Sequence, residues 1–203
     1  MTRESSANEF FQAVKNRRTI YGISKEVTVP DARIQEIISQ AVKHTPSAFN
    51  SQTARVVVLF DESHNKLWDI TAATLRKLVT GDFAATEQKL SGFRNGYGTI
   101  LFFEDQAVVT SLQEKFPSYK DNFPLWSLQS SGMLQLVIWT ALEAEGLGAN
   151  LQHYNPVIDD EVKKTWEIPE EWLLLAQMPF GKKTAPAGEK EFQPLESRVR
   201  FVK

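Results

Sequence analysis

The longest helical pattern in the chain has a second half that is apolar on nearly every side. It spans residues 125–145 and is interrupted only mildly by Ser130-Ser131-Gly132. An all-round apolar helix lies either at the centre of a large core or at a surface shared with a second subunit. A chain of 203 residues has room for one such helix, so the pattern admits a dimer without requiring one. The apolar residues of its second half are Met133, Leu134, Leu136, Val137, Ile138, Trp139, Ala141 and Leu142.

Short apolar runs elsewhere predict the strands of a sheet. Residues 54–60 (ARVVVLF) and 99–104 (TILFFE) are rich in β-branched and aromatic side chains, which is typical of strands buried on both faces. Two more strands are predicted over residues 149–154 and 171–178, and the second is expected to end at Pro179.

The remaining segments predict helices around this sheet and a polar tail. Residues 199–203 alternate in polarity, which is compatible with an edge strand, and the polar segment before them is typical of a tail that wraps a neighbour. The elements alternate irregularly along the chain, which favours an α+β fold. The other predicted helices cover residues 6–16, 30–45, 62–79, 81–93, 106–116 and 158–166.

Composition narrows the classes of function. A formal net charge of −2 gives no general attraction to nucleic acid or to an anionic membrane, so any anion site must be local. The absence of cysteine excludes disulfides, thiolate nucleophiles and zinc–thiolate sites. Residues 1–6 lack an apolar run, and the most apolar stretch, residues 133–142, is too short to span a bilayer. We therefore expect a cytoplasmic protein whose residues 1–203 form one domain.

Most motifs that carry enzymatic chemistry are missing. The three histidines are isolated, and no grouping of His, Asp and Glu matches known metal-ligand spacings, so we expect no metal site. The chain has no G-x-S-x-G nucleophile elbow, no Walker motif and no G-x-G-x-x-G. A serine hydrolase and a nicotinamide cofactor held on a Rossmann domain are therefore disfavoured.

Two segments carry side chains suited to a nucleotide-like ligand. Arg17, Arg18 and Thr19 follow the first predicted helix, and adjacent guanidiniums with a hydroxyl can receive a phosphate ester. Asn50 and Gln52 lie in a turn, and their carboxamides offer donors and acceptors to the edge of a heterocycle. Each feature alone is also explained by surface solvation or turn chemistry. Their order along the chain, together with two later motifs, favours a bound ligand.

That order resembles the nitroreductase family of flavoproteins, in particular its short type from fungi and lactic-acid bacteria. The resemblance covers nearly the whole chain and implies a mixed, mostly antiparallel central sheet flanked by helices. It also implies a homodimer that binds FMN at the subunit interface, with the C-terminal tail of one subunit crossing onto the other. The matching segments are Arg17-Arg18-Thr19, residues 46–52 (PSAFNSQ), residues 146–154 (GLGANLQHY) and residues 179–182 (PFGK).

The resemblance implies that one group of residues holds the phosphate end of FMN. Arg17 and Thr19 would bind the phosphate and the ribityl chain. Arg18 would lie near the ribityl chain or on the pyrimidine side. Lys182 and Arg198 would complete the phosphate clamp, although Arg200 can replace Arg198 because the tail aligns in more than one register.

A second group would contact the flavin ring. Asn50 and Gln52 would meet the polar pyrimidine edge, and Ser47 of the partner subunit would contribute beside them. Backbone groups around Leu151 and Gln152 would face the flavin N5 and the dimethylbenzene side.

The resemblance implies an FMN-dependent NAD(P)H oxidoreductase that reduces nitroaromatics, quinones or both by a ping-pong mechanism. The flavin carries the hydride chemistry, so no side chain is expected to be catalytic. The alternative is a flavin-binding regulatory or stress-response protein with little turnover. A third hypothesis is a cofactor-free interaction module that uses the apolar helix of residues 125–145.

Overall fold

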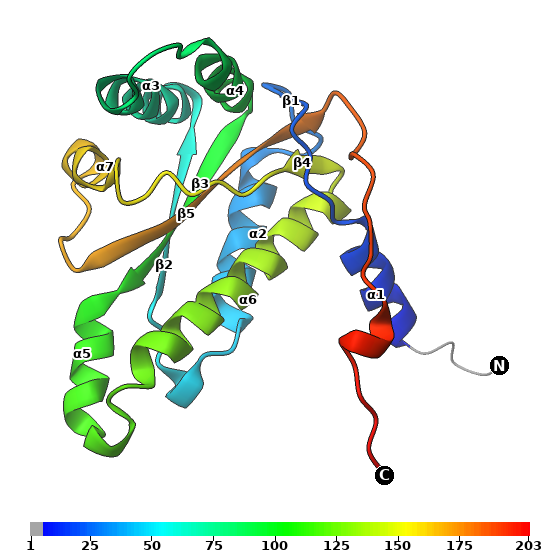
Figure 1. Cartoon of the computed structure of the whole chain (residues 1–203), viewed down its shortest axis with the longest axis vertical. Helices are drawn as coiled ribbons and strands as arrows, with labels where there is room; N and C mark the ends of the chain where they lie inside the picture. The colour runs from blue at the N-terminus through cyan, green and yellow to red at the C-terminus, as the bar shows by residue number, and fades with distance from the viewer. Residues whose placement is uncertain (1–5) are drawn as a thin grey trace.

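The structure, a computed structural model, describes residues 6–203 and has helices on both faces of one sheet (Figure 1). Residues 1–5, which belong to the segment considered for a secretory signal, lie outside the described residues. The predicted α+β fold with a mostly antiparallel sheet is confirmed. The helices are α1 (Ser6–Asn16), α2 (Asp31–His44), α3 (Asp61–Leu78), α4 (Ala84–Arg94), α5 (Gln106–Lys115), α6 (Phe123–Ala144) and α7 (Asp159–Trp166), and the short 3-10 turns are η1 (Ala48–Asn50), η2 (Pro117–Tyr119) and η3 (Leu195–Ser197).

The strands are hydrogen-bonded in the order β1-β5-β3-β2, and β4 pairs along the opposite edge of β5 from β1, because Lys182 pairs with Ser24 on one side and with Leu147 on the other. Every strand pair within residues 6–203 is antiparallel, and in this part of the chain one parallel bridge joins Thr19 to Ala149. The strands are β1 (Ile23–Ser24), β2 (Ala54–Phe60), β3 (Gly98–Asp105), β4 (Leu147–Ala149) and β5 (Trp172–Lys183).

Two separate cores cover the two faces of the sheet. The strict alternation of β3 sends Ile100 and Phe102 to one face and Leu101 and Phe103 to the other. The first face packs against α2 and α6, and the second packs against α3, α4 and α7, as Figure 1 shows. Because β3 is buried on both faces, its continuous apolar sequence is explained.

The prediction that β2 is buried on both faces is wrong. Its residues are mostly half-buried, and Leu59 alone among them is fully buried. The reason is its position, because β2 lies at the edge of the sheet with β3 on one side only. An edge strand of such apolar composition has an unpaired row of backbone groups open to another chain.

The strand boundaries near the C-terminus also differ from prediction. β5 continues through Pro179 to Lys183. The Pro179 carbonyl accepts from the Asn150 amide, on the side of β5 where β4 has just ended. In a strand the N–H and the carbonyl of one residue point to the same side, so the N–H that proline lacks would also point away from β3. Pro179 therefore removes no hydrogen bond between β5 and β3. The strand predicted over residues 149–154 is instead β4 followed by an isolated bridge at Gln152. Residues 199–203 form no strand in the described chain.

The apolar helix, α6, buries only one of its faces. Leu134, Ile138 and Leu142 are at most 2% exposed, whereas Leu136 and Val137 are each 43% exposed. Gly146, with φ of 81°, follows the helix in the left-handed conformation that ends it. None of the helices in residues 6–203 is long and apolar enough to cross a membrane.

Candidate functional site

The end of α1 presents a half-buried cation. The Arg17 guanidinium lies 4.4 Å above the ring of Trp139 on α6. Burial, followed by the neighbouring charge of Arg18, lowers the pKa of Arg17, while Glu143 opposes that shift. Its Nε is buried and has no hydrogen-bond partner within the described residues. An orphaned guanidinium donor beside a second cation indicates a place for an anion.

A cavity of about 410 Å³ opens at this point. Arg18 crosses it to donate to the Gly188 carbonyl at 2.5 Å, so the C-terminal tail forms its far wall. Thr19 is fixed by the bridge to Ala149 and by the Ile20 amide, which donates to the Ala149 carbonyl at 2.9 Å. The residues around the cavity are Arg17, Arg18, Thr19, Tyr21, Gly188, Glu189 and Lys190. Its three cations and two hydroxyls fit the phosphate of a nucleotide-like cofactor, and they outnumber the single carboxylate of Glu189 in the same lining.

The other predicted phosphate ligands lie differently. The Lys182 ammonium is 2.6 Å from Glu26, whereas that of Lys183 is 2.6 Å from Glu143, which acts on Arg17. Arg198 is exposed on the tail, and no contact joins its side chain to the cavity in the described structure. Lys190, which the sequence analysis did not identify, lines the cavity instead.

The predicted pyrimidine-binding loop has an unusual backbone. Phe49, Asn50 and Gln52 have φ values of 58°, 49° and 49°, in the left-handed region that non-glycine residues rarely adopt. The Gln52 amide donates to the Ser47 hydroxyl at 2.9 Å. The side chains of Asn50 and Gln52 are exposed, so the loop presents both carboxamides outward. Strained backbone of this kind is concentrated at functional sites.

Aromatic rings surround this loop. Phe49 stacks on Trp126 with ring centroids 5.8 Å apart and remains 52% exposed. A cavity of about 550 Å³ lies beside the loop, and Ser47, Gln52 and Thr53 contribute to its wall. The rings that contact Phe49 belong to Phe116, Tyr119, Phe123 and Trp126.

Leu151 and Gln152 follow β4 and lie near the Thr19 side of the sheet. Gln152 is buried, and its amide exchanges hydrogen bonds with the Gln177 backbone at 2.7 and 2.9 Å. Its side chain donates to Asn150 at 2.8 Å, and Asn150 donates to the Ile20 carbonyl at 2.9 Å. This chain of amides holds residues 150–152 against the segment that carries Thr19.

One chain does not bring the two predicted groups together. Trp126 contacts the loop and Trp139 contacts Arg17, and both lie on α6. Thirteen residues of helix separate them, which corresponds to about 20 Å at 1.5 Å per residue. The cavities beside Arg17 and Gln52 share no lining residue.

Two polar networks lie in the interior, around Glu104 and around His64. Glu104 is fully buried and accepts from Ser127 at 2.5 Å, and burial raises its pKa. His64 is 2.8 Å from the Thr99 hydroxyl and 3.1 Å from the Arg94 carbonyl, and burial lowers its pKa to about 4. Within residues 6–203, no group of three or more His, Asp and Glu side chains is arranged to hold a metal ion.

Comparison with known proteins identifies the family. The model of the nitroreductase family matches residues 14–182. The chain belongs to the nitroreductase family. HBN1 of Saccharomyces cerevisiae is 36% identical over 192 residues, which span 93% of this chain and 95% of HBN1. The nitroreductase FRM2 of the same yeast is 34% identical over 191 residues, with the same coverage of both chains.

Solved nitroreductases share the fold. The nitroreductase CinD from Lactococcus lactis is 49% identical, with a TM-score of 0.91 over 96% of this chain and all of CinD. A nitroreductase from Saccharomyces cerevisiae is 32% identical, with a TM-score of 0.77 over 89% of this chain and 98% of its own. As a nitroreductase, the chain is assigned to a family of oxidoreductases.

Proposed function

We propose that this nitroreductase is a cytoplasmic, FMN-dependent NAD(P)H oxidoreductase that reduces nitroaromatics, quinones or both. The observation that carries the proposal is the cavity at the end of α1, where Arg17 has a buried donor without a partner in the described chain. A phosphate ester supplies an acceptor for the orphaned Nε of Arg17, and further acceptors for Lys190 and for the donors of Arg18 that Gly188 does not occupy. When bound, FMN supplies the hydride chemistry.

The protein's residues would bind and orient the cofactor. Arg17, Arg18 and Thr19 hold the phosphate and the ribityl chain, with Lys190 added from the tail. Lys182 and Arg198 remain candidates from the sequence, and substitution of each tests its share. The backbone of Leu151 faces the flavin, and the amide chain through Asn150 fixes it beside Thr19, whereas the N–H and carbonyl of Gln152 are already bonded to Gln177.

We further propose that residues 1–203 form one domain and that two copies complete each site. The loop that carries Ser47, Asn50 and Gln52 is about 20 Å along α6 from Arg17, so in a two-fold dimer the loop of one copy can meet the phosphate cavity of the other. The exposed face of α6, with Leu136 and Val137, supplies apolar surface for such an interface.

The tail would cross onto the partner. Phe201 and Val202 are 91% and 84% exposed, and with the exposed Val199 they give the end of the tail an apolar surface that a partner would cover. The edge of β2 offers unpaired backbone groups to a partner's segment. Deletion of residues 199–203 therefore weakens the dimer, and light scattering measures the loss.

The acceptor would be an aromatic ring. The exposed face of Phe49 and its neighbours suits a flat apolar molecule, and CinD has been crystallised with 4-nitrophenol. The carboxamides of Asn50 and Gln52 lie in the same loop and would meet the polar pyrimidine edge of the flavin against which the acceptor stacks.

A visible spectrum tests the function. The purified protein is expected to be yellow, or to become so with FMN, and NADH or NADPH is expected to bleach it. Initial rates with varied nicotinamide and acceptor are expected to give the parallel double-reciprocal lines of a ping-pong mechanism. A protein that takes up no FMN contradicts the proposal. A yellow protein that is reduced only slowly favours the flavin-binding regulatory role instead.

A further inference from the structure

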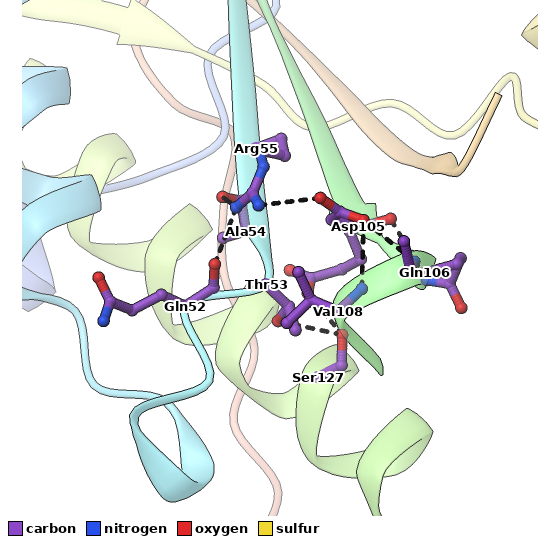
Figure 2. A network of polar contacts seen from close by, with 10 residues as sticks. Gln52, Thr53, Ala54, Arg55, Asp105, Gln106, Val108 and Ser127 are labelled. Atoms are coloured by element: carbon purple, nitrogen blue, oxygen red, sulfur yellow. Dashed lines mark hydrogen bonds and ion pairs between the residues drawn. The ribbon is translucent and has the colours of Figure 1, made fainter. Parts of the chain in front are cut away.

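Arg55 makes an unusual set of contacts directly behind the Asn50–Gln52 loop. Its guanidinium donates to the Gln52 carbonyl at 2.8 Å and to the Ala54 carbonyl at 3.0 Å through one nitrogen. Through the other nitrogen it donates to Asp105 at 2.9 Å. Figure 2 shows this guanidinium between the start of β2 and the end of β3. Arg55 thus joins the last residue of the loop to a neighbouring strand.

Asp105 gives the contact a rigid base. Its other carboxylate oxygen accepts from the Ala107 amide at 3.0 Å and from the Val108 amide at 3.4 Å, which caps the first turn of α5. The Asp105 amide in turn donates to the Thr53 carbonyl at 2.9 Å. The start of α5 and the residue before the strand β2 therefore both restrain Asp105. Asp105 in turn holds the Arg55 guanidinium in a fixed position.

The loop needs such a support. Each left-handed non-glycine residue costs on the order of 1 kcal/mol, and three of them occur within four residues. Gln52 has φ of 49°, and its carbonyl is the atom that Arg55 holds. Since the Gln52 carbonyl lies in the peptide plane between Gln52 and Thr53, the bond from Arg55 fixes that plane and so anchors the C-terminal end of the loop.

We propose that Arg55, held by Asp105, is a positioning residue that keeps the Asn50–Gln52 loop in its cofactor-binding conformation. The inference rests on the proposed function, because it assigns the loop to the flavin ring. Arg55 acts through the loop, because its three hydrogen bonds are all made to the protein. Its loss leaves the phosphate cavity at Arg17 intact and lowers the fraction of molecules whose loop is ready to bind.

The test compares FMN with riboflavin, which lacks the phosphate. Arg55→Gln is expected to weaken both ligands by the same factor, about tenfold, which equals about 1.4 kcal/mol. Arg17→Ala is expected to weaken FMN alone. Arg55→Lys is expected to recover only part of the loss, because an ammonium cannot match the planar set of bonds that a guanidinium makes.

A double-mutant cycle separates positioning from general destabilisation. Arg55→Gln and Asn50→Ala act through the same loop, so their effects on riboflavin affinity are expected to be less than additive, whereas Arg55→Gln and Arg17→Ala are expected to add for FMN. The matched control is Arg94→Gln, which breaks a two-bond pair with Asp69 far from the loop and is expected to leave both affinities unchanged.

Hydrogen exchange provides a readout without flavin. In Arg55→Gln, peptides that contain Gln52 are expected to exchange faster, while peptides from β3 and α6 keep their rates. Riboflavin affinity unchanged in Arg55→Gln but lowered in Asn50→Ala overturns the positioning role and leaves the proposed function standing. Failure of the wild-type protein to bind either flavin overturns the proposed function itself.

Discussion

Removal of the Arg17 guanidinium gives a quantitative test of the phosphate cavity. In Arg17→Ala, the protein without ligand is expected to keep its thermal midpoint, because the lost stacking on Trp139 contributes about 0.5–1 kcal/mol and the orphaned Nε is removed with it. The substitution is expected to lower the affinity for FMN instead. A guanidinium that makes two charge-assisted bonds to phosphate contributes about 3 kcal/mol, so the dissociation constant for FMN rises about 100-fold.

Thermal shift converts this loss into a temperature. At an FMN concentration 100 times the wild-type dissociation constant, binding stabilises the wild-type protein by about 2.7 kcal/mol, and a 100-fold weaker variant by about 0.4 kcal/mol. For a protein of this size these energies correspond to shifts of about 5–11 °C and about 1–2 °C. Riboflavin is expected to shift both proteins equally, since it has no phosphate.

The controls decide which cations belong to the cavity. Lys190→Ala is expected to reduce the FMN shift, whereas Lys182→Ala is expected to reduce it less because that ammonium is paired with Glu26. Arg76→Ala, at an exposed pair with Glu87, is expected to change nothing. An Arg17→Ala protein with the full FMN shift refutes the assignment of this cavity to phosphate.

Three further predictions concern buried charges and the exposed helix face. Burial raises the folded-state pKa of Glu104, so the contribution of Glu104 to the free energy of unfolding is complete below pH 4.5 and is lost as the pH rises. Glu104→Gln should therefore raise the thermal midpoint at pH 8 and lose that advantage in acid. The pKa of His64 is lowered to about 4, so its contribution to the free energy of unfolding is complete above pH 6.5 and falls by about 3 kcal/mol as the pH drops to about 4. Urea unfolding of His64→Gln should lack that part of the acid dependence. Leu136→Asp, on the exposed face of α6, should yield a monomer by light scattering and weaken FMN uptake at least tenfold, whereas Lys120→Asp should not.

Much of the fold follows from local sequence. Pro30 and Pro46 bracket α2, which the structure places at Asp31–His44, and the run ARVVVLF coincides with β2. The half-buried state of β2 could not be predicted from local sequence, because whether a strand is central or at an edge depends on how strands pair across the sheet. The path of β5 through Pro179 depends on where β4 ends, which is also a tertiary property.

The candidate site was predictable in its residue types but less so in its geometry. Since alternate residues of a strand face opposite sides, a strand continued past Pro179 predicts that Lys182 and Lys183 diverge, as they do toward Glu26 and Glu143. Lys190 lies in a polar tail without periodicity, so no pattern pointed to it. Arg55 lies within an apolar strand, and the strand pattern does not predict a functional role for it. Its bonds to Gln52 and Asp105 depend on the pairing of β2 with β3.

The helix α6 also limits how this protein can change during evolution. Trp126 and Trp139 mark its contacts with the loop and with Arg17, and no break in the helix lies between them. One inserted residue between them would rotate one contact by about 100° relative to the other and displace it by about 1.5 Å. Length variation is therefore expected in the connections around α4, α5 and the tail, while the spacing between these two tryptophans stays constant.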